Sequence, residues 1–108
     1  MKLLIGIINN DDASELLSEI TRASFRATKL ATSGGFLRAG NVTVLVGVED
    51  ERLDELVGIF ENCCSKRTQM VPTVPPFIGE GFVNTAPVQI SIGGATIFVI
   101  DVEKYIKL

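Results

Sequence analysis

Apolar and polar positions follow two different periods along this chain. Residues 2 to 8 (KLLIGII) are apolar almost throughout, which is typical of a central strand covered on both sides. Residues 41 to 48 (NVTVLVGV) alternate instead, with valine at every even position, and this period of two predicts a strand with one buried face. Residues 25 to 32 (FRATKLAT) alternate in the same way, so the two segments are expected to pair as a hairpin.

Two segments repeat their apolar residues with the period of a helix. The first helix is expected over residues 12 to 24, where Asp12 begins a D-x-x-E pattern close to a capping box. The second is expected to begin near Asp50, with an apolar stripe opposite acidic side chains. Lys66 and Arg67 follow this stripe, and cations near the end of a helix suit its dipole. Each helix therefore has one face that can cover a sheet.

The last third of the chain contains short strand-like runs and one long loop. A strand is expected within residues 68 to 74 (TQMVPTV), and residues 72 to 87 form a loop rich in proline and glycine. A loop of that length in a small domain usually binds something or is disordered. Residues 88 to 100 (VQISIGGATIFVI) form two runs around Gly93 and Gly94, a pair that signals a two-residue hairpin turn.

The expected order is β-α-β-β-α-β with an extra C-terminal strand, and residues 1 to 108 form a single domain. Helices on one face of an antiparallel sheet give a ferredoxin-like α+β fold. The other face would carry Leu45, Ile97 or Phe98, and several residues of the first strand. Because an exposed apolar face of that size normally marks an interface, we expect a closed homo-oligomer whose sheets pack together.

Charge, histidine and cysteine content narrow the kinds of function. The net charge of −3 disfavours a general nucleic-acid-binding protein, and the absence of histidine disfavours zinc sites and Ser-His or Cys-His nucleophile pairs. Cys63 and Cys64 are adjacent, so we expect free thiols, buried or partly buried, in a reducing compartment. The N-terminal segment lacks the cleavage site of a signal peptide, and no apolar run could span a bilayer, which indicates a cytoplasmic protein.

Residues 28 to 41 (TKLATSGGFLRAGN) combine hydroxyls, glycines and basic side chains around one phenylalanine. They match neither the P-loop nor the dinucleotide-binding motif. The backbone N–H groups of residues 32 to 35 can surround an anion, and Arg26 can add a guanidinium fork. Phe36 offers a flat surface to a ring, and Asn41 offers a paired donor and acceptor. This combination suits a nucleotide held without chemistry; the alternative is a flexible loop with solvated charges and a phenylalanine that anchors the core.

The segment FRATKLATSGGFLRAGNVTVLVGV, together with NCCSKR and GGATIFV further along, resembles the PII-like cyclic di-AMP receptor proteins. The resemblance covers essentially the whole chain. It implies a homotrimer with a PII-like ferredoxin fold that binds three cyclic di-AMP molecules in the clefts between neighbouring subunits. It also implies a signal-transduction protein without enzymatic activity, metal or cofactor. The residues that would bind the ligand by this resemblance are Arg26, Thr28, Gly35, Phe36, Leu37, Asn41 and Gly47.

The resemblance has local departures. Ser24 stands where asparagine is expected, the C-terminal VEKYIKL offers no amide side chain, and the long loop is the least family-like part. The ligand is expected to order residues 33 to 40 and part of 72 to 86, which would change a surface that a downstream protein reads.

Three other functions compete with this interpretation. A PII regulator that binds ATP is disfavoured, because its loop after the second strand is much longer than the one here. A small phosphatase-like enzyme of ferredoxin-like fold would need a phosphate-binding loop after the first strand. In this chain that position holds NNDDAS, whose two aspartates would repel phosphate. A purely structural trimer is the third alternative.

Overall fold

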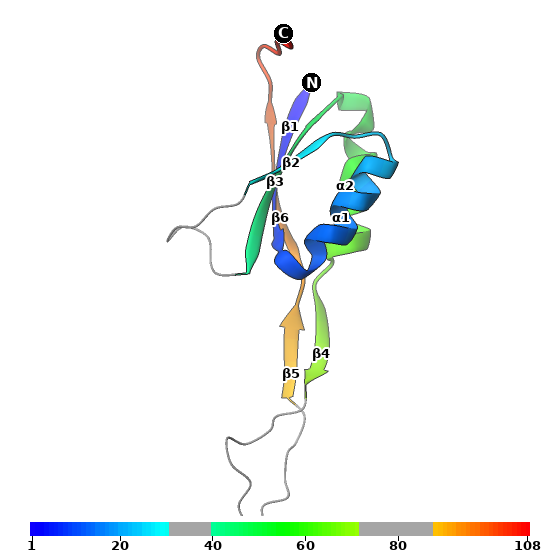
Figure 1. Ribbon diagram of the computed structural model, residues 1–108, viewed down its shortest axis with the longest axis vertical. Coiled ribbons are helices and arrows are strands. Elements are labelled where there is room, and N and C mark those ends of the chain that lie inside the picture. Colours follow the sequence, from blue (N-terminus) through cyan, green and yellow to red (C-terminus); the bar gives the residue numbers. More distant parts are fainter. Residues whose placement is uncertain (31–39, 72–87) are drawn as a thin grey trace, which may run out of the picture.

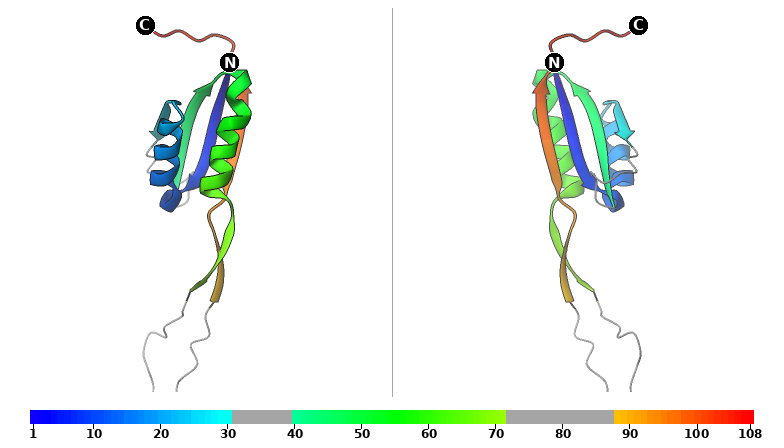
Figure 2. Two further views of the ribbon diagram at one scale, coloured as in Figure 1. Left: turned by 90° about the vertical axis from the view of Figure 1, so that its right-hand side faces the viewer. Right: turned by 90° about the vertical axis from the view of Figure 1, so that its left-hand side faces the viewer.

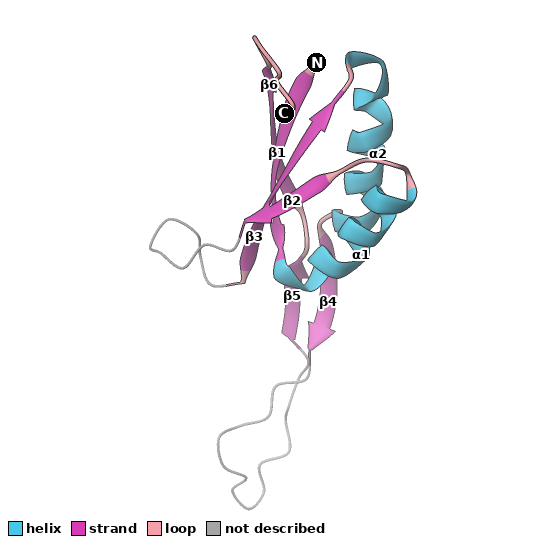
Figure 3. Ribbon diagram, turned by 45° about the horizontal axis from the view of Figure 1, so that its top comes forward, coloured by secondary structure: helices cyan, strands magenta, loops and turns pink. Residues whose placement is uncertain are grey.

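The computed structural model describes residues 1–30, 40–71 and 88–108, and its main element is a four-stranded antiparallel sheet. Two helices lie side by side on one face of this sheet, as Figure 2 and Figure 3 show. The expected α+β fold, with β-α-β-β-α-β order and an antiparallel sheet, is confirmed. The strand order is β2-β3-β1-β6, and the elements are β1 (Lys2–Asn9), α1 (Asn10–Arg22), β2 (Ala27–Leu30), β3 (Asn41–Val48), the 3-10 turn η1 (Asp50–Arg52), α2 (Leu53–Cys64) and β6 (Ala95–Asp101).

Two further strands form a separate ribbon that projects from one end of the domain (Figure 1). These strands are β4 (Arg67–Val71) and β5 (Val88–Ile92), and they pair with each other. The predicted hairpin around Gly93 and Gly94 is therefore wrong, because β6 pairs with β1 instead of β5. Both glycines have positive φ, +79° and +92°, which a hairpin turn and a junction between two sheets can both use. The additional strands are therefore β4 and β5 of the ribbon, and not an extra C-terminal strand as expected. The last strand, β6, belongs to the main sheet.

The hydrophobic core lies between the sheet and the two helices. The valines at even positions of β3 are buried, as the alternation predicts. In β1 the buried positions are Leu4, Gly6 and Ile8. A Cβ atom at Gly6 would stand 2.5 Å from Cε1 of Phe60, an α2 side chain that is 1% exposed. Glycine at this position lets the phenylalanine ring lie directly against the centre of the sheet.

Helix α1 begins two residues earlier than the sequence predicts. Its N-cap is Asn9, whose side-chain oxygen accepts a hydrogen bond from the backbone N–H of Asp11 at 2.8 Å. Asp12 does not cap the helix; it is buried in the first turn, where Oδ1 accepts a hydrogen bond from Nη2 of Arg67 at 2.8 Å. Arg67 is the first residue of β4, so it does not complement the end of α2 as expected. The ion pair instead connects the root of the ribbon to α1.

None of the described elements packs on the face of the sheet opposite the helices (Figure 2, right). We call it the open face. The register places Ile5 beside both Leu45 and Phe98, and Leu3 beside Ile100. Phe98 is 53% exposed and Ile100 48%, whereas Ile97 packs against the core. The sequence left open whether Ile97 or Phe98 lies on this face. The register shows that it is Phe98.

No helix within the described parts of the chain has both the length and the apolar character needed to cross a membrane.

Replacement of Gly58 by alanine is expected to stabilise the protein by about 0.5–1 kcal/mol. Gly58 lies inside α2, and outside the backbone of its own helix a Cβ atom there would meet no described atom within 4 Å. Alanine would therefore lower the backbone entropy of the unfolded chain without a steric penalty in the folded one. Urea denaturation would measure the change, and a lower midpoint for Gly58→Ala would contradict the prediction.

Candidate functional site

The sequence-predicted residues Arg26, Thr28 and Gly47 come together at the β2–β3 edge of the open face. Thr28 pairs with Leu45 in the antiparallel register, and paired residues project from the same face of a sheet. Arg26 directly precedes β2 and lines the same cavity as Gly47, near the end of β3. The side chains of Arg26 and Thr28 are exposed. The structure thus provides a guanidinium, a hydroxyl and a glycine on one accessible surface.

A cavity of about 370 Å³, which we call the Arg26 cavity, opens at this edge. Its walls come from the α1–β2 turn, the end of β3, the residues around η1 and the C-terminal segment. Among the described residues that line it, Arg26, Arg52 and Lys107 are positively charged and Glu49 is negatively charged, with Arg52 paired to Glu55 outside the cavity. The cavity is therefore locally basic in a chain whose net charge is −3, and such a site suits a phosphodiester.

Among the described residues, Gly47 has no steric reason to be a glycine. Apart from its chain neighbours, a Cβ atom built at this position would meet no described atom within 4 Å, and the residue does not have positive φ. Glycine inside a strand weakens it, and often marks a place where a ligand or another backbone approaches closely. The empty space over Gly47 belongs to the Arg26 cavity, so it can receive part of a bound molecule.

Asn41 lies apart from the other three residues. It begins β3, six residues before Gly47, and at the rise of a strand this separates them by about 20 Å. Asn41 lines a second cavity of about 600 Å³, the Asn41 cavity, together with Asn9, Cys64 and Lys66. The backbone N–H of Asn10 donates a hydrogen bond of 2.6 Å to the carbonyl of Gly40, which fixes the entry to β3 beside α1.

The remaining predicted ligand residues, Gly35, Phe36 and Leu37, lie outside the described residues, as does the long loop at residues 72–87. Within the described ranges, no three His, Cys, Asp or Glu side chains are placed to hold a metal ion.

Sequence reasoning did not assign Arg52, Tyr105 or Lys107 to a site, although all three line the Arg26 cavity. Tyr105 and Lys107 lie in a C-terminal segment without a periodic pattern. For Ser24, one signal in the sequence indicated a place in the site, because serine stands where asparagine is expected. Its φ is +68°, a left-handed conformation in which asparagine is several-fold enriched, so the departure marks a strained turn at the cavity wall.

Cys63 and Cys64 are free and buried, as expected, and their thiols should be unreactive in the native protein. Burial, followed by the charge of Asp12, raises the pKa of Cys64 to about 12, and burial also raises the pKa of Cys63. Since the thiolate is the reactive species, we expect Cys64 at pH 8 to react roughly 100-fold more slowly in native than in urea-unfolded protein. Its rate should keep rising above pH 9, because the thiolate fraction grows until the pH passes the raised pKa. Rapid modification of native protein at pH 8, followed by mass spectrometry, would contradict this prediction.

Two comparisons place the chain among known proteins. The model of a family described as cyclic-di-AMP receptor matches residues 1–108, the whole chain. A crystal structure of a functionally unknown protein from Pediococcus pentosaceus is 33% identical, with a TM-score of 0.77 over 99% of this chain and 96% of that one. The structural neighbour supports the fold and the family match supports the ligand class.

Proposed function

Because the chain belongs to the cyclic-di-AMP receptor family, we propose that it binds cyclic di-AMP at the Arg26 end of the open face. The observation that supports this most directly is the position of Gly47 in the Arg26 cavity. An exposed glycine, with no steric role among the described residues, lies in the same cavity as an exposed arginine. That arrangement provides both a charge for a phosphate and room for a ligand to approach the strand.

Each predicted residue has a role in this proposal. The guanidinium of Arg26 pairs with a phosphate, and the hydroxyl of Thr28 donates a hydrogen bond to the same region of the ligand. Gly35, Phe36 and Leu37 form the pocket for one adenine, with Phe36 stacked on the base. For Asn41, which lies about 20 Å along β3 from Gly47, contact with the ligand rests on the family resemblance alone. The adenine pocket of Gly35, Phe36 and Leu37 rests on the same resemblance.

We further propose that the receptor is a homotrimer in which neighbouring subunits complete each ligand site. The open face supports association, because it exposes Phe98, Ile100 and Leu30 beside half-buried residues of β1. An arginine, a hydroxyl and a glycine at the edge of this face would lie next to the neighbouring subunit. The protein acts by binding alone in this proposal, and ligand-induced ordering of residues 33–40 and part of 72–86 presents a new surface to a downstream protein in the cytoplasm.

Isothermal titration calorimetry with cyclic di-AMP tests the proposed ligand, with ATP and cyclic di-GMP as controls. The expected result is saturable binding of cyclic di-AMP alone, near one molecule per subunit. Light scattering of the same sample would give the mass, expected to be that of a trimer. Binding of ATP without cyclic di-AMP would instead favour the PII regulator, and absence of heat with all three nucleotides would contradict the proposal.

Limited proteolysis with and without cyclic di-AMP tests the proposed ordering. Cleavage within residues 33–40 and 72–86 should slow when the ligand is bound, and equal cleavage rates would argue against a loop-based signal.

A further inference from the structure

We propose that Arg52 is a positioning residue for the ligand site, and that it holds the turn from Ala23 to Arg26 in the conformation that presents Arg26 to the cavity. The inference rests on the proposed function for its ligand, but its structural basis is independent of it. Arg52 ends η1, immediately before α2, and lies 29 positions along the chain from the turn that it contacts.

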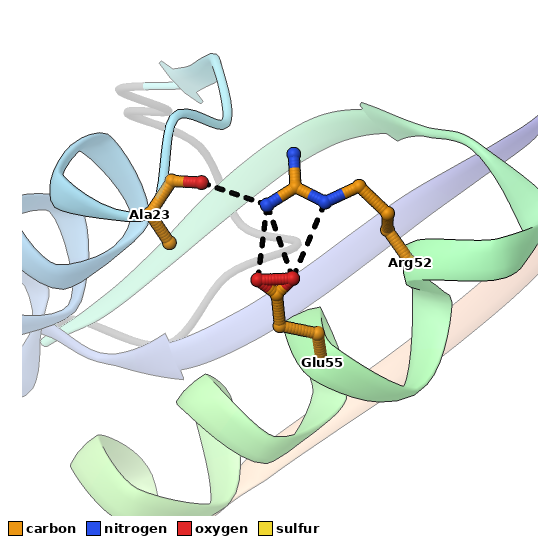
Figure 4. Close-up of polar contacts among 3 residues, drawn as sticks. All are labelled: Ala23, Arg52 and Glu55. Carbon is orange, nitrogen blue, oxygen red and sulfur yellow. Dashed lines mark hydrogen bonds and ion pairs between the residues drawn. The ribbon is translucent and has the colours of Figure 1, made fainter.

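The contacts of Arg52 fix its guanidinium between α2 and the turn (Figure 4). Nη2 donates a hydrogen bond of 2.8 Å to the backbone carbonyl of Ala23. The same nitrogen lies 2.9 and 3.0 Å from the two carboxylate oxygens of Glu55, and Nε lies 3.2 Å from Oε2. The guanidinium carbon is 4.0 Å from the centre of the Phe25 ring, a cation–π contact with a buried aromatic. Arg52 therefore contacts both the carbonyl at the start of the turn and the ring at its centre.

One residue of the turn has a left-handed backbone conformation. Helix α1 ends at Arg22, and Ser24 adopts φ of +68°, a conformation that non-glycine residues rarely hold without surrounding contacts. The N–H groups of Ser24 and Phe25 donate to carbonyls of α1 at 3.0 Å each. These bonds fold the turn back onto its own helix, and the bond from Arg52 connects it to the second helix.

Arg26 is the last residue of this turn and lines the cavity with Gly47. A loosened turn would leave Arg26 with several orientations, and ligand binding would then have to restrict them, which lowers affinity. Glu55 does not line the cavity, yet it holds three of the contacts of Arg52. A change at Glu55 can therefore distinguish two roles of Arg52: positioning of the turn, and direct attraction of the ligand by its charge. If Arg52 acted only as a positive charge on the ligand, removing the neighbouring carboxylate charge would strengthen binding. If it acts through the turn, removing that carboxylate charge would weaken binding.

The test compares Glu55→Gln and Arg52→Lys with the wild type, using Glu19→Gln as the matched control. Glu19 forms an i,i+3 pair with Arg22 of 3.3 Å, the same spacing as the pair between Arg52 and Glu55, and it lines neither cavity. Calorimetry with cyclic di-AMP should show affinity roughly two- to fivefold lower for Glu55→Gln and roughly tenfold lower for Arg52→Lys. Glu19→Gln should bind as the wild type does. Equal or tighter binding by Glu55→Gln would overturn the proposal.

Hydrogen exchange of the backbone amides of Ser24 and Phe25 gives a readout that does not need the ligand. Both variants should exchange these two amides several-fold faster than the wild type, while amides in β3 keep their rates. Unchanged exchange in Arg52→Lys would overturn the positioning role whatever the binding data show. If the wild type binds no cyclic di-AMP, the proposed ligand fails, and the exchange rates alone decide whether Arg52 holds the turn. Should Arg52→Lys fail to fold, Glu55→Gln carries both measurements.

Discussion

Replacement of Gly6 by alanine is expected to destabilise the protein by about 2 kcal/mol, because the added methyl group would overlap the ring of Phe60. The Cβ atom would stand 2.5 Å from Cε1 and 3.0 Å from Cζ. The ring is 1% exposed, and Gly6 pairs with Val44 on one side and Ile97 on the other. Neither the central strand nor the ring can therefore move without disturbing its neighbours. A smaller gain from replacing glycine in a strand offsets part of this cost.

The matching substitution on α2 makes this prediction specific. Phe60→Leu alone should also destabilise, by less than the roughly 3–5 kcal/mol typical of truncating a buried phenylalanine to alanine. In the double variant Gly6→Ala/Phe60→Leu, the shorter side chain makes room for the methyl group, so the two effects should not add. Urea denaturation of the four proteins would give the coupling energy. Strictly additive effects would show that the methyl group and the ring do not conflict.

This contact also matters for the ligand site, because it sets how α2 lies on the sheet. Arg52 directly precedes α2, and Phe60 lies eight residues further along. A helix displaced at Phe60 would move the guanidinium that contacts the α1–β2 turn. Core packing at Gly6 is thus connected to the Arg26 cavity through one rigid helix.

Local patterns predicted the elements of the fold but not all of their partners. The alternation in β3 was informative because only one face of that strand is covered by helices. Gly93 and Gly94 suggested a hairpin because a hairpin turn needs residues that adopt positive φ. That need is local, whereas the choice of the partner strand depends on the whole chain. The start of α1 was misplaced because Asn9 and Asp12 can both cap a helix, and the contact with Arg67 that buries Asp12 is 55 positions away.

The same limit applies to the candidate site, where contacts between distant parts of the chain could not be predicted. Arg26 and Thr28 were predicted from their place on one strand, and Gly47 from the family resemblance. The pairing of β2 with β3 in one hairpin brings the three residues together. Arg52 was missed because its contact with Ala23 joins two helices far apart in the sequence. The C-terminal residues Tyr105 and Lys107 were missed for the same reason, because only the folded chain places them beside the α1–β2 turn.

Gly47→Leu is expected to weaken the binding of cyclic di-AMP by roughly 100-fold, the effect of about 3 kcal/mol of steric conflict. The leucine side chain would extend into the Arg26 cavity, where Gly47 leaves open space. The fold should tolerate the change, because no atom of the described residues other than the chain neighbours lies within 4 Å of the new Cβ position. The melting temperature should therefore stay the same or rise slightly, since glycine inside a strand is itself destabilising. Calorimetry and a thermal melt of the same preparation would measure both quantities.

Gly58→Ala is the matched control for this experiment. Gly58 has the same open space around its missing side chain, but it lies on α2 and lines neither cavity. Gly58→Ala should stabilise the protein without changing its affinity for cyclic di-AMP. If only Gly47→Leu loses binding, the loss comes from the location of Gly47 and not from the replacement of a glycine as such. Light scattering must accompany the titration, because Gly47 also belongs to the open face. Lost binding with the oligomeric mass retained would mean that the ligand approaches β3 at Gly47. Lost binding with loss of the oligomer would assign the glycine to the contact between subunits, and unchanged binding would exclude the ligand from this part of the strand.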